Sequence, residues 1–193
     1  MMEVACTPWR IAGVAWPLPN VWLGTPVVNQ EEADRDIPKL LETPARVRFL
    51  SIEPMLGPIN LGNAIDKDPS HGRFGCVVPD GAQVARCIMP LSLDWIIAGG
   101  ESGPGARPAH PDWLRSLRDQ CTAEGVPFLF KQWGEWLPTE VEHRADGTTG
   151  IYAEDGSERS FEGRHAVAES MARVGKKAAG RLLDGVEHNW FPR

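Results

Sequence analysis

Four short apolar segments constrain the fold of this chain more than any other feature of its sequence. They span residues 21–28, 46–52, 93–98 and 127–133. Each stays mostly apolar along its length, which is typical of strands covered on both faces. Two segments with apolar residues at helical spacing lie among them. This order of strands and helices predicts an α/β fold with a parallel sheet, although Pro26 is unusual inside a strand.

The first helix is expected directly after the first strand. Asn29 and Glu32 have the three-residue spacing of a capping pair at a helix start. An apolar stripe follows at helical spacing, formed by Ala33, Ile37, Leu40 and Leu41. Pro38 lacks a backbone N–H and lies within this stripe, so we expect a break or kink near residues 36–37.

The second helix is expected between the third and fourth strands. It is predicted to begin at Pro111, because proline favours the first helical position. It is predicted to end at Gly125, because glycine favours the position just past the last turn. The residues expected on its buried face are Trp113, Leu114, Leu117 and Cys121.

The four strands predict a partial TIM-like (β/α) barrel at residues 1–137. A complete barrel has eight strands and typically about 250 residues, so this region would form about half of one. Within it, residues 1–20 are interpreted as a connector. Residues of about 62–92 are interpreted as a loop insertion, because Asp, Gly and Pro interrupt any period there. Residues 138–193 would form a C-terminal extension.

The C-terminal extension is predicted to contain a hairpin and a helix. Asp-Gly pairs at 146–147 and 155–156 are turn signals that favour a small hairpin around residues 139–162. A terminal helix is expected at about residues 175–184, with Gly185 directly after its end.

The charge balance limits the partners of the chain. Lys and Arg total 20 and Asp and Glu total 26, which gives a formal net charge of −6. A broad basic surface for nucleic acid is therefore not expected, although a local basic patch is compatible with the sequence. No apolar run approaches the ~20 residues of a membrane helix, and the first residues lack the pattern of a signal peptide. We therefore expect a cytoplasmic protein without a membrane partner.

The four cysteines lack the spacing of a metal site. Cys6, Cys76, Cys87 and Cys121 contain no C-x-x-C pair, which argues against a zinc ribbon or a locally encoded iron–sulfur loop. We expect reduced thiols and no metal ligands. A hairpin between Cys76 and Cys87 would allow a disulfide, but that alternative is the weaker one.

Polar residues follow each predicted strand, at the end where parallel α/β folds bind their ligands. Two carboxylates and an ammonium group would then converge on one rim. The candidate catalytic residues are Glu53, Glu101 and Lys131, and the candidate cofactor-binding residues are Asn29, Gly99, Gly100 and Ser102. Glycines lie on both sides of Glu101, so few neighbouring side chains are expected to cover its carboxylate. Glu101 would therefore bind an amino group or act as a base.

Simpler interpretations of the same residues stay open. Asn29 would be a helix cap, Glu53 and Lys131 would form a structural ion pair, and the glycine pair at 99–100 would be a tight turn. Trp133 and Trp136 would either stack a base or, as we favour, pack at the rim.

Two other chemistries are weaker for the loop after the third strand. A nucleophile elbow around Ser102 would need glycine at the position of Pro104, so the motif fails by one residue. A phosphate cradle built from the loop glycines and Arg107 has neither the G-x-G-x-x-G nor the P-loop spacing.

Five strings of the sequence resemble one protein family. They are WPLPNVWLG at 16–24, FLSIEPMLGP at 49–58, DWIIAGGESGPGARP at 94–108, FKQWG at 130–134 and VGKKAAGRLLDG at 174–185. Together they are similar to a phage- and prophage-associated family of unknown function, over roughly residues 16–193. Full-length members of that family resemble radical S-adenosylmethionine (SAM) barrels.

The resemblance implies cofactors only for full-length relatives. Those proteins carry S-adenosylmethionine and a [4Fe–4S] cluster on an N-terminal cysteine cluster, followed by further βα units, and this chain has neither. Pro26 and Val28 stand where the family has Ser and Glu. The chain alone is therefore expected to be inactive as a radical enzyme.

Three functional hypotheses follow from these observations. The chain is the C-terminal part of a radical-SAM-like barrel, a non-catalytic binding or interaction module, or a small metal-independent enzyme that uses Glu101 and Lys131. A half barrel leaves strand edges and an apolar face uncovered. We therefore expect self-association or a separate N-terminal barrel half as the partner.

Overall fold

A four-stranded parallel sheet forms the centre of the protein. The computed structural model describes residues 9–11, 14–66, 92–139, 151–152, 158–159 and 170–192. The sheet has the order β3-β4-β5-β6 and consists of β3 (Trp22–Pro26), β4 (Val47–Ile52), β5 (Trp95–Gly99) and β6 (Phe128–Gln132). All neighbouring pairs are parallel, which confirms the predicted α/β class. The sheet is open, so a closed TIM-like barrel is not shown by these four strands.

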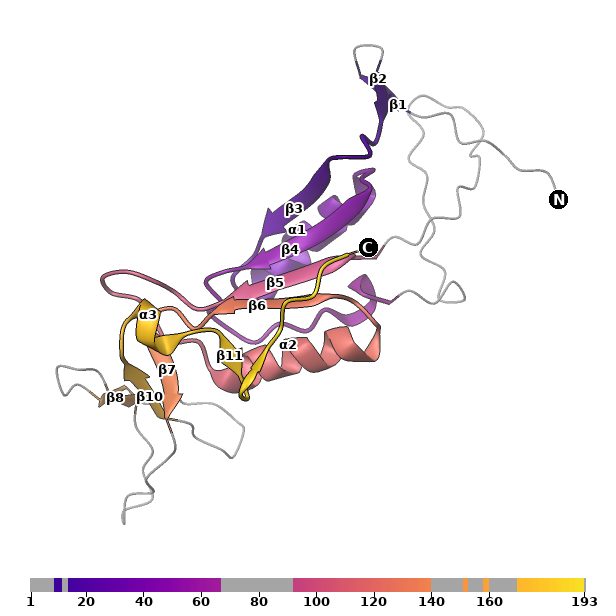
Figure 1. The fold of residues 1–193 in the computed structure, drawn as a ribbon. Coiled ribbons are helices and arrows are strands. Elements are labelled where there is room, and N and C mark those ends of the chain that lie inside the picture. The colour runs from indigo at the N-terminus through magenta and orange to yellow at the C-terminus, as the bar shows by residue number, and fades with distance from the viewer. Residues whose placement is uncertain are drawn as a thin grey trace.

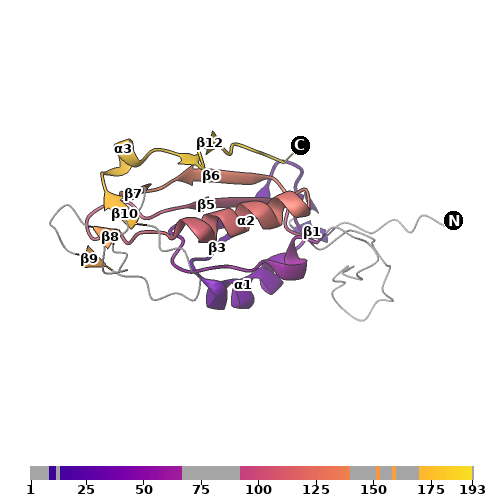
Figure 2. The ribbon, with the colours of Figure 1, turned by 90° about the horizontal axis from the view of Figure 1, so that it is seen from below.

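Two helices cover one face of this sheet (Figure 2). They are α1 (Gln30–Glu42) and α2 (Pro111–Ala123). The start of α1 confirms the capping pair, because the backbone N–H of Glu32 donates to Asn29 Oδ1 at 3.0 Å. The Glu32 carboxylate in turn accepts from the N–H of Val28 at 3.0 Å. Two backbone donors at the helix start are thereby satisfied.

The break expected at Pro38 does not occur. Helix α1 continues through this residue to Glu42. Pro38 is exposed, whereas Ile37 and Leu40 on either side of it are buried. Burial of the apolar stripe on both sides therefore stabilises the helix enough to tolerate the one hydrogen bond that proline removes.

Helix α2 begins and ends as predicted. Pro111 occupies its first turn, and His110 caps it by accepting from the N–H of Asp112 at 3.2 Å. Gly125 follows its end with φ of +63°, a conformation that favours glycine. Leu114, Leu117 and Cys121 are fully buried, whereas Trp113 is only partly buried. The core of the protein lies between the two helices and the sheet.

The C-terminal segment lies along the outer edge of β6, on the side of the sheet away from α1 (Figures 1 and 2). The N–H of Phe130 donates to His188 O at 2.9 Å, and the N–H of Trp190 donates to Phe128 O at 3.3 Å. This antiparallel pairing covers the β6 edge, which is one of the two edges of the sheet that were expected to be uncovered.

An aromatic cluster occupies the helix-free face near the amino ends of the strands. Trp95 contacts Trp22, Phe49 and Phe191, with ring centroids 5.8, 5.8 and 5.1 Å apart. The indole N–H of Trp95 also donates to Trp190 O at 2.8 Å. These contacts hold the C-terminal segment against the sheet.

A second sheet lies beyond the carboxyl end of β6 (Figure 1). Its order is β7-β10-β8-β9, formed by β7 (Trp136–Thr139), β10 (Ser170–Arg173), β8 (Ile151–Tyr152) and β9 (Glu158–Arg159). The antiparallel pairing of β8 with β9 agrees with the predicted hairpin. Both of its Asp-Gly turn signals lie outside the described residues.

The predicted terminal helix is wrong in its extent. Helix α3 comprises only Lys176–Ala179 and is followed by the hairpin strands β11 (Leu182–Leu183) and β12 (Val186–Glu187). Asp184 and Gly185 form the turn, with φ of +53° and +76°. Positive φ at both central residues matches a tight hairpin turn, so this Asp-Gly pair is a hairpin signal and not a helix end.

The described parts of the remaining segments are short. Residues 9–16 contain an antiparallel pair, β1 (Trp9–Ile11) and β2 (Val14–Trp16), where a plain connector was expected. The predicted loop insertion begins with the 3₁₀ turn η1 (Gly62–Ala64), and residues 67–91 lie outside the described part. Among the described helices, none combines the length and the apolar character that a membrane crossing requires.

Candidate functional site

A network of polar side chains lies at the carboxyl ends of β4, β5 and β6. Lys131 Nζ is 2.7 Å from Glu53 Oε2. The Gln132 amide donates to Glu53 Oε1 at 2.9 Å and to Ser102 Oγ at 3.1 Å. The structure therefore brings together three of the predicted residues, Glu53, Lys131 and Ser102, and adds Gln132, the last residue of β6.

The absence of a side chain at residue 99 makes this network possible. Glu53 follows β4 and Gln132 ends β6, so β5 separates them. A Cβ atom at Gly99 would lie 3.3 Å from Glu53 Oε1 and 3.2 Å from Gln132 O. Gly99 is therefore a packing residue that lets two side chains meet across the middle strand.

Glu53 and Lys131 differ in how far their side chains are exposed to solvent. The Glu53 side chain is only 17% exposed, whereas the Lys131 side chain is 56% exposed. An ion pair with one exposed partner contributes at most about 1 kcal/mol to stability. The predicted ion pair is confirmed, because the two charged groups are in contact. Since the pair contributes little to stability, Lys131 can leave Glu53 and bind another anion.

A hollow of about 670 Å³ opens on the helix-free face beside this pair. Its size lies within the usual range for small-molecule sites. Its lining combines an apolar wall with charged and amide groups: Ser51, Glu53, Ile97, Leu129, Lys131, Arg181, Asn189 and Phe191. Sequence reasoning missed the last three because their segment was interpreted as a helix followed by a tail.

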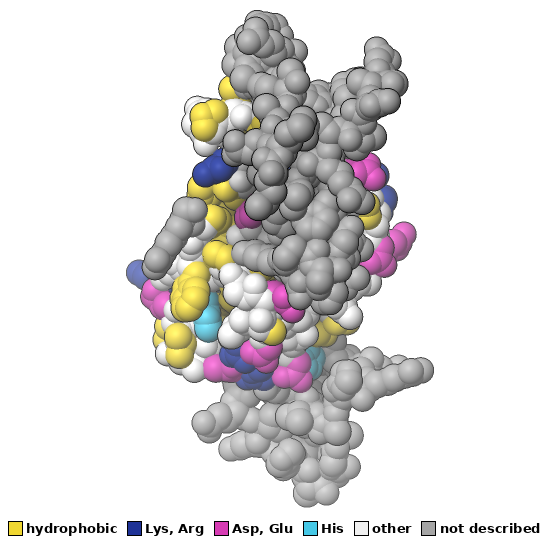
Figure 3. Space-filling view, turned by 90° about the vertical axis from the view of Figure 1, so that its right-hand side faces the viewer, with side chains coloured by type: hydrophobic (Ala, Val, Ile, Leu, Met, Phe, Trp, Pro, Cys, Tyr) yellow, Lys and Arg dark blue, Asp and Glu magenta, His cyan; other side chains and the backbone are white. Residues whose placement is uncertain are grey.

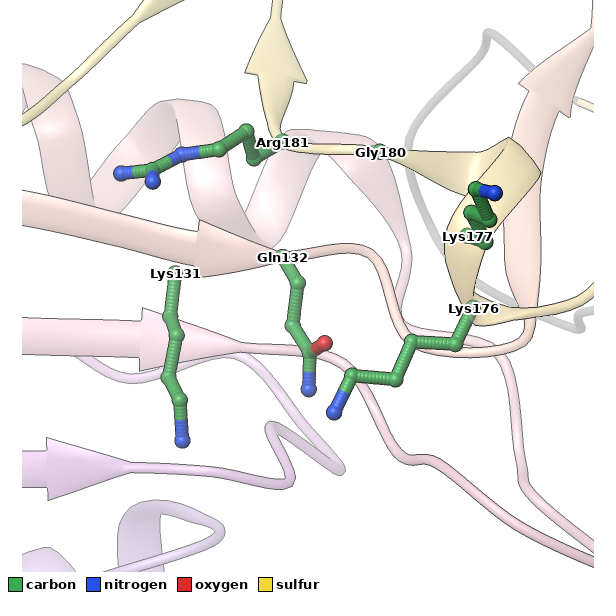
Figure 4. Close-up of a pocket in the computed structure, with 6 residues that line it drawn as sticks. All are labelled: Lys131, Gln132, Lys176, Lys177, Gly180 and Arg181. Carbon is green, nitrogen blue, oxygen red and sulfur yellow. The ribbon is translucent and has the colours of Figure 1, made fainter.

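A second hollow of about 400 Å³ lies on the other side of Lys131 (Figure 4). Its lining is formed by Lys131, Gln132, Lys176, Lys177, Gly180 and Arg181. Figure 4 shows Lys176 extending toward Gln132, whereas Arg181 extends back along β6. Lys131 and Arg181 line both hollows.

Glu101 does not belong to the network around Glu53. Its Oε2 accepts from the Arg107 backbone N–H at 2.7 Å and from Arg107 Nε at 2.8 Å, and its Oε1 accepts from Arg107 Nη2 at 2.8 Å. These hydrogen bonds hold the pKa of Glu101 below its usual value. The expectation of little side-chain cover was wrong, and a lowered pKa argues against a general base.

The glycines after β5 serve close packing between two loops. A Cβ atom at Gly100 would lie 1.9 Å from Trp133 O, and one at Gly134 would lie 1.9 Å from Glu101 O. The N–H of Gly100 donates to Gln132 O at 2.8 Å. The N–H of Gly103 donates to Glu135 Oε1 at 3.0 Å. These amides already have partners within the protein, which removes the donors that a phosphate cradle would need.

The two tryptophans after β6 are packed at the rim. Trp133 and Trp136 are 2% and 3% exposed. Their indole N–H groups donate to Leu182 O at 2.8 Å and to Ala106 O at 2.7 Å. Rim packing is therefore confirmed, and neither ring presents a face for stacking a base.

The described residues do not fit an iron–sulfur cluster. Cys121 is buried in the core, and burial raises the pKa of its thiol to about 12, so it is not a thiolate ligand. Within the described ranges, no group of three His, Cys, Asp or Glu side chains is placed to hold a metal ion. Cys6, Cys76 and Cys87, and with them the disulfide alternative, lie outside the described residues.

The surface of the described part carries both signs of charge. Figure 3 shows hydrophobic side chains gathered toward one flank, with acidic and basic side chains mixed below them. Arg115 and Arg118 of α2 both pair with Asp184 of the last hairpin.

Comparison with known proteins assigns the chain to a family. No curated protein and no solved structure matches the chain significantly. A family model described as a protein of unknown function (DUF5131) matches residues 1–192, which is nearly the whole sequence. The chain therefore belongs to the DUF5131 family.

Proposed function

We propose that this chain binds a small ligand on the helix-free face of its sheet, as the C-terminal part of a radical-SAM-like barrel of phage origin. The observation that carries the proposal is the hollow beside the pair of Glu53 and Lys131. In this proposal the chain supplies binding groups and does not itself carry out radical chemistry, because its four cysteines lack the spacing of a cluster-binding loop.

The position of the hollow supports binding. Ligands of parallel α/β folds lie beyond the carboxyl ends of the strands, and the network of Glu53, Lys131 and Gln132 occupies that position. Ile97 and Leu129 give the hollow an apolar wall. An apolar wall with a few convergent polar groups is the usual composition of a small-molecule site.

The strand order supports the barrel interpretation. The four strands are neighbours in chain order and all parallel, with both long helices on one face. A (β/α) barrel has the same arrangement, with helices outside and ligand groups at the carboxyl ends of the strands. The helix-free face would then correspond to the barrel interior.

Each polar residue has a defined role in this proposal. Glu53 would accept a hydrogen bond from a hydroxyl or amino group of the ligand, because its carboxylate is already oriented by Gln132. Lys131 would exchange its contact with Glu53 for a contact with the ligand. Ser102 would act as a positioning residue, because its Oγ accepts from Gln132.

Filling the hollow tests the proposal. The probe is 8-anilinonaphthalene-1-sulfonate, whose apolar rings and sulfonate match the wall and the cations of the hollow. The Ser51→Phe variant should lower its fluorescence enhancement severalfold, because the new ring would occupy the space. Ser116→Phe, which adds the same ring on exposed α2, serves as the control. Equal enhancement in both folded variants would refute binding in the hollow.

The free edge of β3 supports a second role, as one half of an assembled barrel. Within the described residues no strand pairs with that edge, and Trp22 beside it is 43% exposed. A separate N-terminal barrel half, or a second copy of this chain, would continue the sheet there. Light scattering of the purified chain should show a species heavier than 21.2 kDa. A monomer that binds no apolar dye would contradict this role.

A further inference from the structure

A basic groove adjoins the hollow on the helix-free face (Figure 4). It is the hollow of about 400 Å³ lined by Lys131, Gln132, Lys176, Lys177, Gly180 and Arg181. Its four cationic side chains come from β6, from α3 and from the residue after Gly180. Three separate segments therefore contribute cationic side chains to the lining of this hollow, and Figure 4 shows their ends pointing in different directions.

Most of this charge is not neutralised. Lys131 pairs with Glu53 at 2.7 Å. Neither Lys176 nor Lys177 has an ion-pair partner among the residues that the structure describes. Arg181 donates from Nη2 to the amide oxygen of Asn189, which is a neutral group. The groove thus holds an excess of positive charge in a chain whose formal net charge is −6.

Glu53 is the partner of Lys131, and two further carboxylates form hydrogen bonds with groups outside the groove. Glu187 accepts from the Asn189 amide at 2.7 Å. Glu135 Oε1 accepts from the N–H of Gly103 at 3.0 Å. Concentrated, unpaired cations in a concave site attract and retain anions, because the low-dielectric walls strengthen their field.

We propose that this groove binds the phosphoryl group of a small phosphate ester, and that the organic part of that ester lies in the hollow on the sheet. The proposal rests on the proposed function and adds the chemical class of the ligand. The two hollows share Lys131 and Arg181, so one molecule can reach both.

A phosphoryl group fits the groove better than a carboxylate does. A phosphate ester carries a charge of about −1.5 to −2 at neutral pH and three acceptor oxygens. Two lysines and an arginine of the lining can turn toward such a group from different sides, as point charges and as a bidentate fork. A carboxylate has two oxygens in one plane and needs only one such fork. Apolar residues of the sheet hollow, Leu129 and Phe191 among them, would then contact the organic part.

Calorimetric titration at low salt tests this inference on the full chain. The probes are adenosine 5′-monophosphate, adenosine and inorganic phosphate. We expect the monophosphate to bind most tightly and its affinity to fall as salt is raised, because salt screens the groove. The double variant K176A/K177A and the single variant R181A should each weaken binding of the monophosphate by about tenfold or more, the loss typical of charged hydrogen bonds.

A matched variant controls for loss of charge alone. K39A/R46A removes two cations from α1 and from the loop before β4, and it should leave all affinities unchanged. Circular dichroism establishes that each variant is folded. If K176A/K177A does not fold, R181A and the salt dependence of the wild-type protein still decide the matter. Salt-independent binding, or equal affinities in the groove and control variants, would overturn the inference.

The probes separate this inference from the proposed function. If inorganic phosphate binds through Lys176, Lys177 and Arg181 but the monophosphate gains no affinity over it, the groove is an anion site and the sheet hollow is not used. If adenosine binds and Ser51→Phe abolishes its binding, but the groove variants do not affect the monophosphate, the hollow is a ligand site and the phosphoryl assignment is wrong.

Discussion

The two faces of the parallel sheet differ in how they are completed. The face under α1 and α2 is closed by fully buried side chains, Leu114 and Leu117 among them. The opposite face carries partly exposed apolar residues, a charged pair and two hollows. Close packing leaves no room for a ligand. Stability therefore depends mainly on the helix-covered face, whereas the helix-free face has room for the proposed ligand.

The largest expected effect is a difference in the free energy of unfolding between substitutions on the two faces. Leu117→Ala on α2 should lower the free energy of unfolding by about 2–5 kcal/mol, because it opens a cavity in a fully buried site. Leu129→Ala on the helix-free face should cost only about 1 kcal/mol, because this side chain is already partly exposed. Urea denaturation followed by circular dichroism measures both. Equal losses would mean that the second face is packed as tightly as the first.

The next effect concerns the loops that border the site. Gly100→Ala should destabilise the protein by about 1–3 kcal/mol, because its Cβ would lie 1.9 Å from the backbone oxygen of Trp133. Gly57→Ala is the matched control, since its Cβ would meet only Asn29 Cβ at an ordinary 3.6 Å. Thermal unfolding of the two variants tests the difference. A neutral Gly100→Ala would show that the two loops are not packed against each other as described.

A smaller effect decides between two roles of Asn29. As a helix cap, its replacement by alanine should cost about 1 kcal/mol, because the N–H of Glu32 loses its acceptor. Asn29→Ser should retain most of the stability, since serine also caps helices. Denaturation midpoints give the stabilities, and titration of the monophosphate gives the affinity. Weaker binding by a fully stable Asn29→Ser would instead support the predicted contact of Asn29 with the ligand.

Features that depend on short stretches of sequence could be predicted. Apolar runs predicted the four strands along the chain, and the spacing of Asn29 and Glu32 predicted the start of α1. Local patterns failed where long-range burial decided the outcome. The apolar stripe around Pro38 kept α1 continuous, and the pairing of residues 188–190 with β6 made the last segment part of the sheet.

The candidate site was predictable only where it follows strand ends. Glu53 and Lys131 meet because parallel strands end at the same edge. Glu101 also follows a strand, but it pairs with Arg107 of its own loop and not with a residue of another strand end. Lys176, Lys177 and Arg181 come from a segment far away in the chain, and no spacing rule links them to the strand ends. Their position depends on the turn of the chain at Gly180, which sequence interpretation placed inside a helix.

The smallest effect concerns the pH dependence of the Glu101–Arg107 pair, which sharpens the distinction between the two predicted carboxylates. The hydrogen bonds from Arg107 lower the pKa of Glu101 below its usual value of 4.5. A carboxylate with a lowered pKa in the folded state stabilises the protein fully above its usual pKa, and this contribution is lost as pH falls through the lowered value. Stability should therefore decrease below about pH 4.5, and Glu101→Gln should flatten part of that decrease while changing little at neutral pH.

Glu124→Gln, which removes an exposed carboxylate after α2, is the control. Urea denaturation at several acidic pH values measures the slopes. A different outcome is that Glu101→Gln leaves the slope of stability against pH unchanged but abolishes binding of the monophosphate. Glu101 would then belong to the ligand site, and the assignment of a binding role to Glu53 and a structural role to Glu101 would be wrong.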